Sequence, residues 1–371
     1  MSFKQFPNTL HIIVSLLLGP PETRMEVTSS LNMSLVTNLT HAKGPTHCEQ
    51  VDTSGHVYFA LAYSLVFLVG LLLNGFTMKV YFCSGQQGVF SIMLVYLKNL
   101  AVSDFLLCLC LPFYIANFTS SSITIRLVHC NFASSIFYLN MYASILFMGY
   151  IAAGRYLKII HPSGNHILQT VQAARIISMV TWVVLLAIMT SYITLLLLTQ
   201  PPLTVVPDSC DALQSAQVIV FYKIIHICSA VTFLFIFISL VFFYYSASRT
   251  VWLAEQKQLS SSSCKKLMKS RKKMLVLVSV FCICFMPYHL GLIPYALLKR
   301  QCSSRRVLYY LIEVTILLSV LNVCLDPLIY FISCKAFRTK LNLKRVFSRT
   351  KQTPSTDTRS NEGQLSTINI N

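Results

Sequence analysis

The sequence is poor in charged residues, and in acidic residues above all. Only 11% of its 371 residues are Asp, Glu, Lys or Arg, and only 12 residues are acidic. Soluble domains use about 25% charged residues to cover their surface, so this composition excludes an ordinary soluble domain. Instead, 55% of the residues are hydrophobic and the mean hydropathy is +0.63. Such values are typical of an integral membrane protein.

The sequence also lacks the common catalytic motifs. It contains no phosphate-binding Gly-rich loop, no Cys and His spacing typical of a zinc site, and no recurring set of nucleophile, base and oxyanion donors. We therefore expect a protein that is not an enzyme and needs no cofactor. The formal net charge of +18 does not indicate nucleic-acid binding, because the basic residues flank apolar segments rather than forming a separate module.

Seven apolar runs are long enough to cross a membrane as helices, which takes about 20 residues each. Only short polar loops separate them, so we expect an all-α membrane protein with one bundle of seven transmembrane helices. The predicted spans are residues 58–82, 92–118, 127–160, 176–199, 218–245, 274–298 and 307–333.

The distribution of Lys and Arg predicts the orientation in the membrane. Basic residues concentrate between spans five and six, where Glu255 is the only acid, so that loop and the C-terminus are expected in the cytoplasm. The N-terminus is then extracellular, as in a multi-pass plasma-membrane protein. Three glycosylation sequons, at Asn32, Asn38 and Asn117, fall on the predicted outer side.

The remaining segments lie outside the predicted bundle of residues 57–333. Residues 1–56 form an extracellular segment whose apolar stretch at 10–18 is either a signal-peptide core or precedes a start at Met25. Residues 334–348 are expected to form an amphipathic helix, and residues 349–371 a disordered cytoplasmic tail rich in Ser and Thr.

Four of the thirteen cysteines are expected on the outer side, whereas most of the others lie inside spans. The extracellular compartment is oxidising, so we expect two disulfide bonds. The four cysteines are Cys48, Cys130, Cys210 and Cys302.

Two carboxylates, Asp104 and Asp326, lie deep in apolar spans, where a charge is costly and therefore a functional candidate. Asn74, Ser144 and Asn322 offer polar partners on these or neighbouring spans. Such an oxygen-rich set suits a sodium ion or a shared proton. A hydrogen-bonded structural network is the alternative.

Polar-tipped rings in the outer half of spans three and six predict a ligand pocket between helices. A lysine and a glutamate near the outer ends of spans five and seven extend this set. Snorkelling of Lys223 and a membrane-interface position of Tyr295 are the alternatives for those two residues. The candidates are Tyr138, Tyr142, Tyr288, His289, Tyr295, Lys223 and Glu313.

The motifs "LLLNGF", "LAVSDFLLCLCLPF", "FCICFMPYH" and "NVCLDPLIYF" occur in this order in the predicted spans. In these motifs, the chain resembles the rhodopsin-like G-protein-coupled receptors over residues 58–347. The phrases "YLKNLAVSD", "IFYLNMYASI" and "RYLKIIHP" are most similar to the metabotropic purinoceptors for ADP and UDP-sugars and their orphan relatives. The resemblance implies a receptor for an extracellular ligand that acts on heterotrimeric G proteins of the inhibitory class, with arrestins and receptor kinases as further partners.

The resemblance also implies roles for single residues. It pairs Cys130 with Cys210 and Cys48 with Cys302, and it makes Cys334 a palmitoylation candidate. The sodium ligands would be Asp104, Ser144, Asn322 and Asp326. The residues that respond to the G protein would be Arg155, Tyr156, Phe285, Pro287, Asp326, Pro327 and Tyr330.

The chain departs from the nucleotide-receptor pattern in the residues that would hold phosphate. Leu292 and Ile312 stand where that branch has an arginine and a lysine, so we expect a weak response, or none, to ADP and UDP-glucose. Outer basic residues at 299, 300, 305 and 306 would still steer an anionic ligand toward the pocket. A lysophospholipid-type receptor, a constitutively active or heteromer-forming receptor, and a channel or transporter are the alternative functions.

One further departure concerns the residue before Arg155. The family normally has an Asp or Glu there, which pairs with the arginine and holds the inactive state, but this chain has Gly154. We therefore expect raised basal signalling.

Overall fold

The computed structural model describes residues 55–82, 92–160, 167–200, 210–256, 261–298 and 305–333. Within these ranges the regular structure is helical and contains no strand. The predictions for the N-terminal segment, the amphipathic helix and the tail lie outside the described residues. So do those for Asn32, Asn38, Cys48, Cys302 and Cys334.

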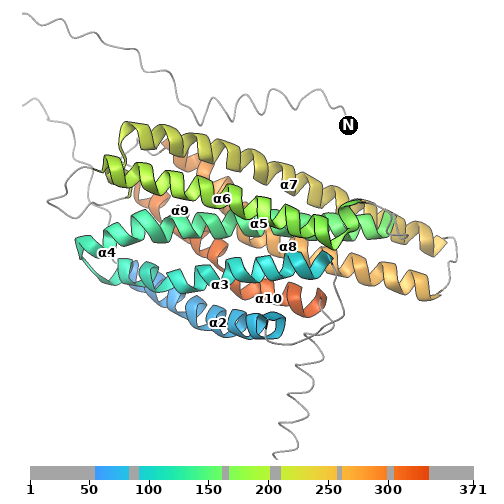
Figure 1. Cartoon of the computed structure of the whole chain (residues 1–371). Coiled ribbons are helices and arrows are strands. Elements are labelled where there is room, and N and C mark those ends of the chain that lie inside the picture. The colour runs from blue at the N-terminus through green and yellow to red at the C-terminus, as the bar shows by residue number, and fades with distance from the viewer. Residues whose placement is uncertain are drawn as a thin grey trace, which may run out of the picture.

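Seven helical segments are long and apolar enough to cross a membrane, which confirms the predicted bundle. They run side by side along one axis (Figure 1). The third span combines a short helix, a π-helical turn and a long helix, and the seventh consists of two helices. The elements are α2 (His56–Phe82), α3 (Ile92–Thr119), α4 (Ile123–Val128), η2 (His129–Ala133), α5 (Ser134–Ile160), η3 (Ile167–Gln169), α6 (Val171–Thr199), η4 (Cys210–Leu213), α7 (Ala216–Gln256), α8 (Ser261–Leu298), α9 (Arg305–Val320) and α10 (Asn322–Ser333).

Helices α7 and α8 are longer than the apolar runs that predict them. The apolar run of span five ends at residue 245, but α7 continues to Gln256, and α8 begins at Ser261, 13 residues before the predicted start at 274. Lys, Arg, Gln, Glu and Leu in these extensions are good helix formers, so the helix outlasts the hydrophobic pattern. The two extensions protrude together past the other helices, at the end opposite α4 (Figure 1).

The third span lies at the centre of the bundle and α6 at its edge. In the most apolar stretch of each span, 72% of the residues are buried in the third span but only 11% in α6. Exposed side chains such as Val183 and Leu198 on α6 are apolar, as a surface facing lipid hydrocarbon requires. The third span thus contacts other helices over most of its surface, whereas α6 does not.

Close approach of α2 to α10 depends on a glycine. A Cβ atom at Gly70 would lie 2.9 Å from Cγ2 of Val323, which is closer than real side chains pack. This proximity lets the Asn74 side-chain amide donate to the carbonyl oxygen of Val323 at 2.7 Å. The bond satisfies a backbone acceptor close to Leu321, where the helix of the seventh span is interrupted.

Candidate functional site

Asp104 on α3 lies at the centre of a buried polar network. Its Oδ2 atom accepts a 2.7 Å hydrogen bond from the hydroxyl of Tyr330 on α10. Its Oδ1 atom accepts longer bonds, each 3.4 Å, from the side-chain amides of Asn140 on α5 and Asn322 on α10. Three helices thus meet at one carboxylate that has no exposed surface.

Asn322 extends this network to α5. Its side-chain nitrogen also donates to Oδ1 of Asn140 at 3.3 Å and to Oγ of Ser144 at 3.2 Å. Asp326, one turn further along α10, faces Asp104. The Oδ1 atom of Asn322 and both carboxylate oxygens of Asp326 are buried and accept no well-formed hydrogen bond from the described residues. Buried acceptors of this kind call for a donor, a water or a cation.

The four predicted sodium ligands therefore form a single site, which also includes Tyr330 from the predicted switch residues. The structure brings together the side chains of Asp104, Ser144, Asn322 and Asp326. Their buried polar atoms that lack a well-formed hydrogen bond are all oxygens, the ligand atoms that hard cations prefer. Tyr330 bonds the same carboxylate. Asn140 belongs to this network but was missing from the candidates, although a lone asparagine in an apolar run was a signal for it.

A second cluster, made of aromatic and histidine rings, occupies the outer half of the bundle. The hydroxyl of Tyr288 on α8 donates to the hydroxyl of Tyr138 on α5 at 3.3 Å. Tyr142 lies edge-on to His289, with 6.4 Å between ring centroids. His226 on α7 joins the cluster by packing edge-on against Tyr138 at 5.5 Å. Four predicted ligand residues thus lie together, and His226 is an addition that the sequence analysis missed.

A series of ring contacts leads from this cluster toward the interior. His289 stacks on Phe233 at 3.8 Å, Phe233 stacks on Phe281 at 5.5 Å, and Phe281 meets Phe285 edge-on at 5.6 Å. Pro287 lies in α8 within this stretch, where it removes one backbone donor and favours a kink. The rings of Phe233 and Phe281 thus connect His289 to Phe285, which is fully buried.

The other predicted ligand residues lie elsewhere. Lys223 is exposed on α7, although Tyr222 and His226 on either side of it stack on each other at 3.8 Å. Tyr295 is half-buried near the end of α8. Glu313 on α9 faces a different group of rings, those of Tyr63, Tyr114 and Tyr309.

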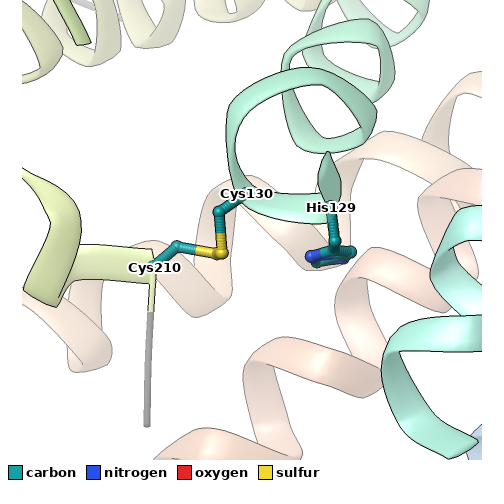
Figure 2. A group of neighbouring side chains, drawn as sticks. All are labelled: His129, Cys130 and Cys210. Carbon is teal, nitrogen blue, oxygen red and sulfur yellow. A yellow bond between two sulfur atoms is a disulfide. The ribbon is translucent and has the colours of Figure 1, made fainter. Parts of the chain in front are cut away.

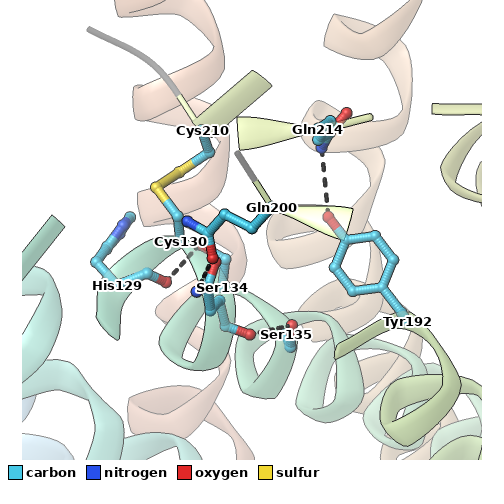
Figure 3. The surroundings of a disulfide bond; sticks show 9 residues. His129, Cys130, Ser134, Ser135, Tyr192, Gln200, Cys210 and Gln214 are labelled. Carbon is cyan, nitrogen blue, oxygen red and sulfur yellow. Dashed lines mark hydrogen bonds between the residues drawn. A yellow bond between two sulfur atoms is a disulfide. The ribbon is translucent and has the colours of Figure 1, made fainter. Parts of the chain in front are cut away.

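The disulfide bond between Cys130 and Cys210 joins the start of the long third span to the segment before α7, with 5.4 Å between the Cα atoms. This is the pairing that the resemblance implies. His129 lies beside the bond (Figure 2) and packs edge-on against Tyr114 at 4.6 Å. Hydrogen bonds brace the neighbourhood, including one from Gln214 to the Tyr192 hydroxyl at 3.3 Å (Figure 3).

The end of α5 that carries Arg155 is also packed into the bundle. Arg155 is 7% exposed, and Tyr156 stacks on Phe243 of α7 at 4.8 Å. A Cβ atom on Gly154 would lie 3.1 Å from the flexible end of Met93, so a side chain fits there after a small adjustment. These contacts connect the ends of α3, α5 and α7.

The sequon at Asn117 lies in the last turns of α3, and its side chain is 7% exposed. A glycan on this nitrogen requires the turn to open. Glycosylation here stays a prediction.

Comparison with known proteins identifies the class that this bundle represents. The family described as "7 transmembrane receptor (rhodopsin family)" matches residues 73–330. The chain belongs to this family of membrane receptors, whose members are G-protein-coupled receptors rather than enzymes.

Individual relatives place the chain in one branch of the family. It is 33% identical to purinoceptor 14 of the metabotropic (P-two-Y) type from Bos taurus, over 76% of this chain and 83% of the relative. It is 32% identical to G-protein coupled receptor 87 of Mus musculus, over 81% and 83%. Lysophosphatidic acid receptor 6 of Gallus gallus is 29% identical, over 77% and 93%. The chain is thus a multi-pass membrane protein of the purinoceptor and lysophospholipid-receptor branch.

Proposed function

We propose that this protein is a plasma-membrane receptor with an extracellular N-terminus, which couples an anionic ligand to heterotrimeric G proteins of the inhibitory class. The observation that carries the proposal is the ring series from His289 to Phe285, because it connects the outer cluster to the bundle interior. Arrestins and receptor kinases would act on the Ser- and Thr-rich tail.

An anionic ligand is supported by relatives named for purines and for a lysophospholipid. The exposed Arg306 at the start of α9 adds positive charge on the outer side. Leu292 and Ile312 supply no cation for a polyphosphate, so a lysophospholipid-type ligand is favoured over a nucleotide.

A signalling assay in cells tests this function. Cells expressing the full chain are exposed to ADP, UDP-glucose and lysophosphatidic acid, and cyclic AMP is measured with and without pertussis toxin. We expect the lipid to lower cyclic AMP in a toxin-sensitive way and the nucleotides to act weakly or not at all. Untransfected cells and an Arg155→Ala variant at matched surface expression are the controls. A toxin-resistant response would contradict the inhibitory class, and a strong nucleotide response would contradict the proposed ligand.

We also infer that the network around Asp104 binds a sodium ion. The proposed ligands are oxygens of Asp104, Ser144, Asn322 and Asp326. The inference is supported by the buried side-chain oxygens of Asn322 and Asp326, which accept no well-formed hydrogen bond from the described residues. Purified receptor is expected to melt at a higher temperature in sodium chloride than in choline chloride of equal ionic strength. The difference should vanish in Asp104→Asn, and an equal difference in both proteins would overturn the inference.

A further inference from the structure

Glu313 on α9 is a carboxylate without a partner in the part of the chain that the structure describes. It is largely enclosed by the bundle, yet it makes no hydrogen bond and no ion pair with any described residue. A carboxylate withdrawn from water in this way favours a donor or a cation beside it. On the surrounding helices α2, α3 and α9, the groups that interact with it electrostatically are tyrosines.

Three tyrosines surround Glu313 closely enough to interact with it electrostatically, namely Tyr63, Tyr114 and Tyr309. The Tyr63 ring packs against Tyr114 at 5.4 Å and stacks on Phe118 at 5.7 Å. Tyr63 is 0% exposed, and its hydroxyl has no hydrogen-bond partner within the described ranges. A carboxylate among tyrosine rings is the environment that an ammonium group prefers, through both charge and ring faces.

One cation acts on the same space. Arg126 on α4 interacts electrostatically with Glu313, Tyr309 and His129, but it is not close enough to Glu313 for an ion pair. The site therefore presents a negative and a positive group that lie near each other without being joined in an ion pair. A ligand group with both signs of charge complements this arrangement better than a simple anion or a simple amine does.

We propose that Glu313 and Arg126 form a subsite for a zwitterionic ligand group, in which an ammonium contacts Glu313 and a phosphate or carboxylate contacts Arg126. The hydroxyl of Tyr63 contributes a further hydrogen bond. The proposal rests on the proposed function, in that the ligand already carries an anion, and it adds a nearby ammonium. The subsite is formed by residues of α2, α3, α4 and α9, and Tyr114 lies between it and the ring cluster of Tyr138 and His289.

The test uses the purified full-length receptor and three probes. Oleoyl lysophosphatidylethanolamine carries phosphate and ammonium, oleoyl lysophosphatidic acid carries phosphate alone, and phosphoethanolamine carries the zwitterion without the lipid. Affinity is measured from thermal stabilisation, and nucleotide exchange on an inhibitory-class G protein is measured in parallel. The test variants are Glu313→Gln and Tyr63→Phe. The matched control is Glu255→Gln, which changes a glutamate on the last turn of α7.

We expect the ethanolamine lipid to bind at least about tenfold more tightly than lysophosphatidic acid, the usual effect of one charge-assisted bond. Glu313→Gln should abolish this preference and Tyr63→Phe should reduce it, whereas Glu255→Gln should leave it intact. If phosphoethanolamine also stabilises the receptor, the free head group is sufficient for binding. If only the ethanolamine lipid does so, binding also requires the acyl chain. Either result supports the subsite.

Equal affinity of wild-type receptor for the two lipids, no stabilisation by either zwitterion, or an equal loss for both lipids in Glu313→Gln would overturn the subsite. Failure of the proposed function has a different signature. Stabilisation without nucleotide exchange would contradict the receptor function and leave the subsite standing. Exchange driven equally by both lipids would contradict the subsite alone.

Discussion

Two enclosed carboxylates in this bundle have opposite surroundings. Asp104, at the centre of the polar network, accepts hydrogen bonds from Tyr330, Asn140 and Asn322. Glu313, in the outer part of the bundle, accepts none from described residues and is surrounded by rings. A carboxylate bonded by two other helices holds those helices in place, whereas an unbonded one is available to something that arrives from outside. Asp104 is therefore held by the helices around it, whereas the acceptors of Glu313 remain for the ligand group proposed above.

The sequence reflects the same division. The network around Asp104 keeps the residue types that the resemblance implies, including Asn322, Asp326 and Tyr330. The outer ends of spans six and seven differ from the nucleotide receptors at Leu292 and Ile312. The departures from the pattern of the nucleotide receptors thus concern the outer ends of these spans and not the network around Asp104.

The largest expected effect on stability comes from removing the hydrogen-bond acceptor at Asp104, and the same change at Glu313 provides the comparison. Asp104→Ala should be less stable than Asp104→Asn by about 2 kcal/mol, because alanine leaves the Tyr330 hydroxyl without an acceptor and asparagine retains one. Glu313→Ala and Glu313→Gln should differ by less than about 0.5 kcal/mol, since no hydrogen bond is lost. Thermal unfolding of the purified variants measures both differences. Equal differences at the two sites would remove the contrast between them.

Removing the tyrosine hydroxyl beside each carboxylate should change stability by a smaller amount, with opposite signs at the two sites. Tyr330→Phe loses a 2.7 Å bond and should destabilise the receptor by about 1 kcal/mol. Tyr63→Phe removes a buried hydroxyl that has no described partner, so stability should stay the same or rise by up to about 1 kcal/mol. The same melting assay without ligand checks the prediction, and a clear loss of stability in Tyr63→Phe would show that this hydroxyl is already bonded.

The smallest effect concerns a carboxylate that the chain lacks, at the cytoplasmic end of α5. Gly154→Asp should lower ligand-free signalling several-fold by stabilising the inactive state by about 1 kcal/mol. Gly154→Ala is the matched control, because its methyl group meets the same Met93 side chain without adding charge. Basal nucleotide exchange is measured at equal surface expression. If Asp and Ala variants signal equally, charge at this position has no part in basal activity.

Most of the fold could be predicted because the bilayer imposes a minimum length on each apolar run. Every predicted span corresponds to a helical segment, as the apolar run at 92–118 does to α3. The resemblance carried by the sequence motifs also predicted a single site for Asp104, Ser144, Asn322 and Asp326. The structure brings these residues together. The polar extensions of α7 and α8 were not predictable from hydropathy, because polar residues continue a helix without leaving an apolar signal.

The inner faces of the helices were harder to predict. In a soluble helix the apolar face marks the core, but a spanning helix is apolar on all sides and its pattern does not show which side turns inward. Lys223 was therefore grouped with the ligand residues although it is exposed, and the buried His226 was missed. Tyr63 and Arg126 were missed for a related reason, since only the packing of helices distant in sequence brings them near Glu313.

The bond between Cys130 and Cys210 has a consequence for the connectivity of the chain. With a sequence separation of 80, it closes a covalent ring that contains all of α5 and α6. A protease that cuts once between these helices opens the ring but does not divide the molecule. The two fragments should migrate as one species in gel electrophoresis until a thiol reductant is added, so an intact band without reductant does not prove an uncut receptor.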